Sequence, residues 1–143
     1  GFATVPVHLI ELMTKCVEKV YSAVATPSQY AALVAFDKGM EAMMAMKKEY
    51  KKRRDFLVSR INEMDKISCI MPKGAFYVFA NIKKTGLSAE EFAERLLEKE
   101  HVAVIPGSNF SKNASGYVRI SYGTSMEKIE DGLNRMERFL KSL

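Results

Sequence analysis

The sequence has 143 residues, of which 48% are hydrophobic and 27% are charged, and these values are typical of one soluble globular domain. No apolar run approaches the ~20 residues that a membrane-spanning helix needs, so we expect no membrane partner. The N-terminal residues lack a basic segment followed by an apolar stretch, which argues against a signal peptide. The first residue is Gly1 instead of Met, which suggests that the chain was cut from a longer one.

Basic residues outnumber acidic ones by 22 to 17, giving a formal net charge of +5. Much of this charge comes from one cluster, which consists of Lys47, Lys48, Lys51, Lys52, Arg53 and Arg54. At helical spacing these residues share one side of a helix, which fits either a nucleic-acid surface or a solvated helix face. No reading helix or RNA-binding signature accompanies them, so we expect a solvated face and no nucleic-acid partner.

The first part of the chain reads as helical. Pro6 suits the first turn of a helix, and apolar residues follow it at helical spacing as far as Val20. The segment 22–27 interrupts this pattern, and Ser28 is a plausible N-cap for a second helix. The second pattern continues to about residue 64, with Gly39 as a weak point within it.

Short strand-like segments alternate with helices after residue 65. They lie at residues 68–71, 75–80, 102–105 and 117–122. Ser88 with Glu91, and Thr124 with Glu127, have the spacing of a capping box and predict the starts of two further helices. A sheet covered by helices is therefore expected, an α/β or α+β sandwich, with a boundary near residue 65 between a helical arm and a compact domain.

Few residues carry chemistry in a recognisable pattern. His8 and His101 have no second ligand at suitable spacing, so no metal site is expected. Cys16 and Cys69 are too few for a disulfide framework, and we expect two free thiols, which fits a reducing cytoplasm. Neither a nucleophile elbow nor a glycine-rich phosphate loop is present.

Arg119 is the exception, because it lies inside an apolar strand, between Val118 and Ile120. Strand alternation places Arg119 on the face opposite to its two neighbours. If that face is solvent, the residue is an ordinary surface arginine. If the face is a cleft, a guanidinium on a rigid strand could bind a carboxylate through two parallel hydrogen bonds.

Three motifs in order strongly resemble the C-terminal domain of class I and II aminotransferases, which share the aspartate aminotransferase fold, called fold type I. The motifs are Gly74-Ala75-Phe76-Tyr77-Val78-Phe79, then residues 102–110 ending in Pro106-Gly107-Ser108-Asn109-Phe110, then Tyr117-Val118-Arg119-Ile120-Ser121-Tyr122. Upstream, Gly1-Phe2-Ala3, residues 28–32 and Arg53-Arg54-Asp55 also resemble family positions. The resemblance covers essentially the whole chain.

The resemblance implies an aminotransferase small domain at residues 65–143, with a mostly antiparallel sheet packed by helices. Residues 1–64 would supply the end of the large domain and the connecting helices. Arg119 matches the family arginine that holds the α-carboxylate of the amino-acid substrate. The parent enzyme would transfer an amino group between an amino acid and a 2-oxo acid, in the cytoplasm and as a homodimer.

The cofactor of such enzymes is pyridoxal 5'-phosphate, bound to a Schiff-base lysine that should precede Gly1. Lys73, in the turn beside Gly74, is the candidate in this chain for a Schiff-base lysine, but no family motif matches it to the cofactor lysine. Thr26 is the one candidate cofactor-binding residue here, acting across a dimer interface. We therefore expect no catalytic residue in this chain, and neither activity nor cofactor binding by the chain alone.

Two alternatives remain at this point. A carbon–sulfur lyase on the same scaffold would share these motifs. A non-catalytic dimerisation or interaction module would instead use the methionine-rich helices, whose residues Met40, Met43, Met44 and Met46 suit an adaptable surface.

Overall fold

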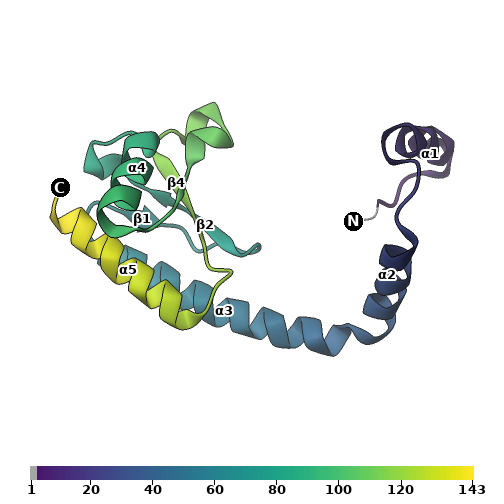
Figure 1. Cartoon of the computed structure of the whole chain (residues 1–143), viewed down its shortest axis with the longest axis horizontal. Coiled ribbons are helices and arrows are strands. Elements are labelled where there is room, and N and C mark those ends of the chain that lie inside the picture. The colour runs from purple at the N-terminus through teal and green to yellow at the C-terminus, as the bar shows by residue number, and fades with distance from the viewer. Residues whose placement is uncertain (1–2) are drawn as a thin grey trace. The chain divides into compact units, whose positions relative to one another are not determined.

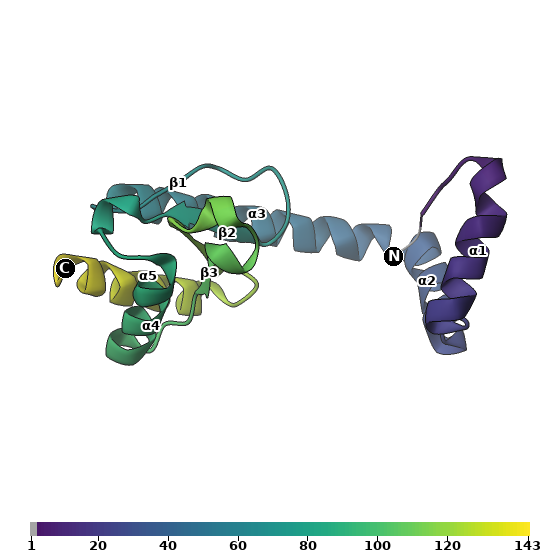
Figure 2. The same cartoon turned by 90° about the horizontal axis from the view of Figure 1, so that it is seen from above.

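The computed structural model describes residues 3–143, so the Gly1-Phe2 part of the proposed family match lies outside the described residues. Within this range the chain forms five α-helices and one four-stranded sheet (Figures 1 and 2). The chain divides into two compact units, one that ends at Met44 and one that comprises Ala45–Leu143. A mixed α/β fold with a small sheet was predicted, and the structure confirms it. The boundary between large-domain and small-domain segments at residues 64 and 65 stays a prediction.

The first unit is helical, as the apolar spacing predicted. It contains α1 (Val7–Tyr21), α2 (Thr26–Lys38) and the start of α3 (Met40–Glu63). Neither α1 nor α2 has a buried residue. No helix within residues 3–143 combines the length and the apolar character that crossing a membrane requires.

Two details of these helices differ from the prediction. The helix expected to start after Ser28 begins at Thr26, because Pro27 fits in the first turn, where no backbone N–H is needed. Gly39 ends α2 instead of merely weakening one long helix. A Cβ at this position would overlap the carbonyl oxygen of Ala35, so the close approach of the backbone requires glycine there.

The second unit is built around the sheet. Its strands are β1 (Ser68–Cys69), β2 (Tyr77–Asn81), β3 (Ile105–Pro106) and β4 (Tyr117–Ser121), in the order β1-β2-β4-β3. All three strand pairs are antiparallel. The strand predicted at residues 102–105 starts only at Ile105, because Val102 and Val104 pack against the core without joining the sheet.

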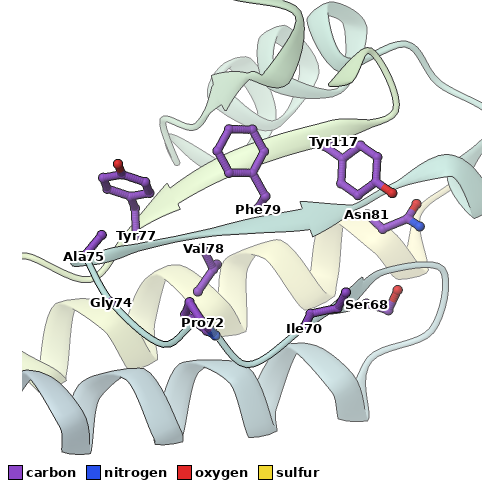
Figure 3. A pocket seen from close by; sticks show the side chains of 10 residues that line it. All are labelled: Ser68, Ile70, Pro72, Gly74, Ala75, Tyr77, Val78, Phe79, Asn81 and Tyr117. Carbon is purple, nitrogen blue, oxygen red and sulfur yellow. The ribbon is translucent and has the colours of Figure 1, made fainter. Parts of the chain in front are cut away.

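One face of the sheet forms the core with three helices. These are the C-terminal part of α3, then α4 (Ala89–Glu100) and α5 (Met126–Lys141). Val78 is buried and points toward the helices (Figure 3). Val118 of β4 is buried in the same core cluster. The rings of Phe92 in α4 and Phe139 in α5 meet edge to face, with centroids 5.3 Å apart. Arg60 of α3 donates a hydrogen bond to Asn134 of α5 at 2.9 Å, which ties these two helices together.

The two predicted capping boxes had different outcomes. Ser88 and Glu91 form the box at the start of α4, with both reciprocal hydrogen bonds present. The second box was wrong, because Ser125 and not Thr124 is the N-cap of α5, accepting a hydrogen bond from the backbone N–H of Lys128. Helix α5 thus begins one residue later than the Thr124 spacing implied. Its apolar stripe is buried and includes Ile129, Leu133, Met136 and Leu140.

Candidate functional site

Arg119 lies in the middle of β4, paired with Phe79 of β2 on one side and with Ile105 of β3 on the other. Strands on both sides fix its backbone. The buried neighbour Val118 faces the helices, so the alternation along the strand places the Arg119 side chain on the opposite face of the sheet. Figure 3 shows Tyr77 and Phe79 projecting on this opposite face, which we call the aromatic face.

Two aromatic rings hold the Arg119 guanidinium. Its central carbon lies 4.5 Å from the centroid of the Phe110 ring and 5.1 Å from that of Tyr77. The Phe110 ring in turn meets Phe79 edge to face, with centroids 5.7 Å apart. Within residues 3–143 the guanidinium forms no ion pair or hydrogen bond, so its in-plane N–H donors remain available for an anionic ligand.

The turn that carries Phe110 is anchored at two points. Gly107 packs against the backbone oxygens of Ala114 and Tyr117 so closely that a Cβ would overlap them. Ser108 donates a hydrogen bond from its Oγ to the Glu90 carboxylate at the start of α4, and this bond lowers the pKa of Glu90 below its ordinary value. The sequence indicated only a turn here, whereas the structure shows a turn joined to both α4 and the start of β4.

The segment that leads into β2 is also fixed. The Tyr122 hydroxyl donates to the carbonyl oxygen of Ala75 at 2.8 Å, and the Tyr122 backbone N–H donates to that of Phe76 at 2.8 Å. Arg54 donates to the carbonyl oxygen of Pro72 at 3.1 Å. These bonds hold the chain on both sides of Gly74 and so determine where Tyr77 enters the sheet. Burial raises the pKa of the Tyr122 phenol above its ordinary value.

A hollow of about 550 Å³ runs along β2 (Figure 3). Its lining consists of Ser68, Ile70, Pro72, Gly74, Ala75, Tyr77, Val78, Phe79, Asn81 and Tyr117. Arg119 is not part of this lining, but Tyr77 both lines the hollow and contacts the guanidinium. The lining contains no lysine, arginine or acidic residue, so it offers neither a Schiff-base amine nor a charged group for a cofactor phosphate or ring nitrogen.

The other residues singled out from the sequence neither line the hollow nor stack on the Arg119 guanidinium. Thr26 is the exposed first residue of α2, in the unit that ends at Met44, so its cofactor role stays a prediction. Lys73 is exposed in the turn before β2 and does not line the hollow, although Pro72 and Gly74 do. His8 and His101 are both exposed, and no metal-binding group of three or more His, Cys, Asp or Glu side chains occurs among the described residues.

Intramolecular partners account for half of the basic cluster on α3. Arg53 and Lys52 both form ion pairs with Glu49, at 3.1 Å and 3.7 Å, and Arg54 pairs with Asp55 at 2.7 Å. The Lys52 pair is exposed and typical of a solvated helix face, whereas Arg53 and Arg54 are partly buried.

Sequence comparison identifies relatives along nearly the whole chain. The family model described as aminotransferase class I and II matches residues 1–136. The aspartate aminotransferase of Pyrococcus horikoshii is 46% identical over 143 residues, which are 99% of this chain and 37% of that protein. The putative aminotransferase YugH of Bacillus subtilis is 45% identical over 140 residues, 98% of this chain and 36% of that protein. The chain thus spans a little over a third of the length of these relatives.

Structure comparison agrees with the sequence comparison. The crystal structure of an aromatic aminotransferase from Pyrococcus horikoshii OT3 superposes with a TM-score of 0.91 at 43% identity, covering 97% of this chain and 37% of that one. The aspartate aminotransferase of Rhizobium meliloti superposes with a TM-score of 0.86 at 30% identity, covering 95% of this chain and 36% of that one.

Proposed function

The chain belongs to the class I and II aminotransferase family, and on this premise we propose that it is the C-terminal part of a pyridoxal-phosphate-dependent enzyme of amino-acid metabolism. The complete enzyme transfers an amino group between an amino acid and a 2-oxo acid. This chain contributes Arg119, which binds the α-carboxylate of the substrate. Because the chain spans only 37% of its relative from Pyrococcus horikoshii, the activity belongs to the complete gene product and not to this chain alone.

The free guanidinium of Arg119 is the observation that carries this proposal. A carboxylate presents two oxygens in a plane, and the guanidinium fork meets them with two parallel charge-assisted hydrogen bonds. The paired strands around Arg119 keep its backbone in place, so a bound carboxylate is held in a fixed direction. Fixing one end of the substrate orients the bonds at its α-carbon, which reduces the entropy lost on the way to the transition state.

The residues around Arg119 do not by themselves fit pyridoxal phosphate. Neither its two aromatic contacts nor the lining of the hollow provides a lysine, so the Schiff-base lysine is expected ahead of Gly1. The cofactor of such enzymes supplies an electron sink. The part that we assign to this chain is recognition of the substrate carboxylate.

The remaining expectations concern assembly and location. A homodimer is supported by the apolar side chains that α1 and α2 expose, and in such a dimer Thr26 would contact the cofactor of the partner subunit. Cytoplasmic location is supported by two cysteines that both remain free thiols. Sedimentation of the complete gene product tests the dimer.

The direct test of the proposed activity is an assay of the complete gene product with pyridoxal phosphate. L-Aspartate, L-phenylalanine or L-alanine is supplied with 2-oxoglutarate, and glutamate formation is measured. We expect glutamate with at least one donor, and a large loss of this activity in Arg119→Ala. Release of ammonia and thiol from cystathionine, with no glutamate formed from any donor, would instead identify the carbon–sulfur lyase alternative.

The exposed apolar side chains also favour a second function, a non-catalytic interaction module. Its surface would be formed by apolar residues of α1 to α3 that are more than two-fifths exposed, including Val7, Leu12, Val20, Tyr30, Leu33, Phe36, Met40 and Met44. In this case the complete gene product would self-associate or bind a protein partner without forming glutamate. The transaminase assay separates the two functions, because self-association is expected of both.

A further inference from the structure

Phe110 is half-exposed, with 50% of its surface accessible, and it does not belong to the core cluster. Its ring is nevertheless the closer of the two rings on Arg119, at 4.5 Å from the guanidinium carbon. We propose that Phe110 is a positioning residue, whose ring keeps the Arg119 guanidinium in the orientation that receives the substrate carboxylate. This inference rests on the proposed function of Arg119 as the carboxylate ligand.

A ring and an acidic partner would affect this arginine differently. A carboxylate beside Arg119 would occupy the same N–H donors that the substrate needs, and the substrate would have to displace it. An aromatic ring attracts the cation through its π-face and leaves the in-plane donors free. Among the described residues the guanidinium has rings and no acid as neighbours, which suits a binding group that must be both ordered and unoccupied.

The position of Phe110 is set by its backbone and not by burial. Its N–H donates to the carbonyl oxygen of Gly107 at 2.9 Å, which closes the turn. Gly107 is in close backbone contact with Ala114 and Tyr117, and Ser108 is bonded to Glu90. The edge-to-face contact with Phe79 then fixes the ring. Loss of the ring should therefore leave the turn and the core in place.

Loss of the Phe110 ring should weaken the binding of the substrate carboxylate by Arg119. Arginine has many rotamers, and a guanidinium that is ordered in advance loses less entropy when the ligand binds. The carboxylate contact is the same in the ground state and in the transition state, so its weakening raises KM and leaves kcat nearly unchanged. A cation–π contact of this strength corresponds to about a fivefold change in affinity.

The test is steady-state kinetics of the complete gene product with the amino-acid donor that it uses best. Phe110→Leu should raise KM for that donor about fivefold, with kcat within about twofold of wild type. Phe110→Tyr keeps the ring and should stay within about twofold of wild type in both values. Leu97→Ala removes an equally exposed apolar side chain on α4, 50% accessible, and serves as the control for loss of surface area.

A double-mutant cycle with Arg119→Ala separates positioning from a structural role. If Phe110 acts through the guanidinium, Phe110→Leu should change KM by less than about twofold when Arg119 is already alanine. A fivefold effect that persists in the Arg119→Ala background overturns the inference, as does an unchanged KM in Phe110→Leu alone. If Arg119→Ala itself leaves kcat/KM unchanged, the proposed function of Arg119 fails instead, and the inference falls with it.

Discussion

Val118 and Arg119 are neighbours in one strand, yet they belong to two faces of the sheet that differ in composition and in contacts. Val118 is fully buried among apolar side chains from α3, α4 and α5. Arg119 is partly exposed on the aromatic face, held by Tyr77 and Phe110. The core face gains its stability from burial, whereas the aromatic face keeps a charged group ordered without neutralising it. Substitutions on the core face should therefore change the free energy of unfolding, whereas substitutions on the aromatic face should change the kinetics with the substrate.

The largest expected effect is on the aromatic face and concerns binding. Arg119→Ala in the complete gene product should lower kcat/KM for amino-acid donors about 1000-fold, because two charge-assisted hydrogen bonds are lost. Its melting temperature should fall less than that of a core variant, since Arg119 is partly exposed, makes two cation–π contacts, and forms no ion pair or hydrogen bond within residues 3–143. Arg119→Lys keeps the charge without the fork, so an intermediate loss is expected. A melting temperature that falls as far as that of a core variant would contradict the separation of the two faces.

The alkylation rate of the Cys69 thiol reports on burial at the core face of the sheet. Cys69 lies in β1, pairs with Ala80 of β2 and packs against the core. Burial raises the pKa of its thiol to about 11. The thiolate is the reactive form, so alkylation of Cys69 by iodoacetamide at pH 8 should be about 100-fold slower in the native protein than in urea. Cys69→Ser serves as the control, because it removes this thiol and so identifies the Cys69 adduct beside that of Cys16.

The raised pKa of Cys69 also has a consequence for stability. The unfolded thiol ionises near its ordinary value of 9.0 while the folded thiol stays protonated until about 11. The protonated Cys69 thiol therefore contributes fully to the free energy of unfolding below pH 9, and this contribution is lost as the pH rises from 9 to about 11. Equal alkylation rates of Cys69 in the native and unfolded protein would show that β1 does not bury this thiol.

A smaller effect is expected from a truncation in the core. Val118→Ala removes two methyl groups from a fully buried position and should lower the free energy of unfolding by about 2 kcal/mol in a urea titration. KM for the amino-acid donor should remain within about twofold of wild type, because the strand pairing around Arg119 is unchanged. A KM that rises as in the Arg119 variants would mean that the two faces are coupled through β4.

The smallest effect concerns the segment that leads into β2. Tyr122→Phe removes the hydrogen bond to the Ala75 carbonyl oxygen at 2.8 Å and should cost about 1 kcal/mol of unfolding free energy. Ala75 is exposed, so water can replace the lost donor, which limits the cost. Urea titration of the variant beside wild type measures this difference, and an unchanged midpoint would show that the phenol does not hold the segment.

Local sequence patterns were sufficient to predict much of the fold. The period of two in residues 117–122 placed Arg119 opposite to Val118, and the Ser88-Glu91 spacing gave the start of α4. Apolar spacing predicted the helices, but it could not show that α1 and α2 bury nothing within the described residues. Burial depends on what packs against a helix, and that information is not local.

The surroundings of Arg119 were not predictable in this way. Alternation separates two faces but does not say which face helices will cover. Phe110 was part of a recognised motif, yet its contact with Arg119 depends on the packing of Gly107 against Ala114 and on the bond from Ser108 to Glu90. The available signal was an aromatic residue, Phe110, at the end of the Pro106–Asn109 turn, and this pattern alone does not identify its partner.

The carboxylate role of Arg119 is tested most directly by changing the substrate together with the residue. The amino acid that the complete gene product uses best is compared with the amine that lacks its carboxyl group, in wild type and in Arg119→Ala. The preference for the amino acid, measured as a ratio of kcat/KM values, should fall by about 100-fold or more in the variant, with activity toward the amine nearly unchanged. An equal loss for both substrates, leaving the ratio at its wild-type value, would contradict the assignment of Arg119 as the carboxylate ligand.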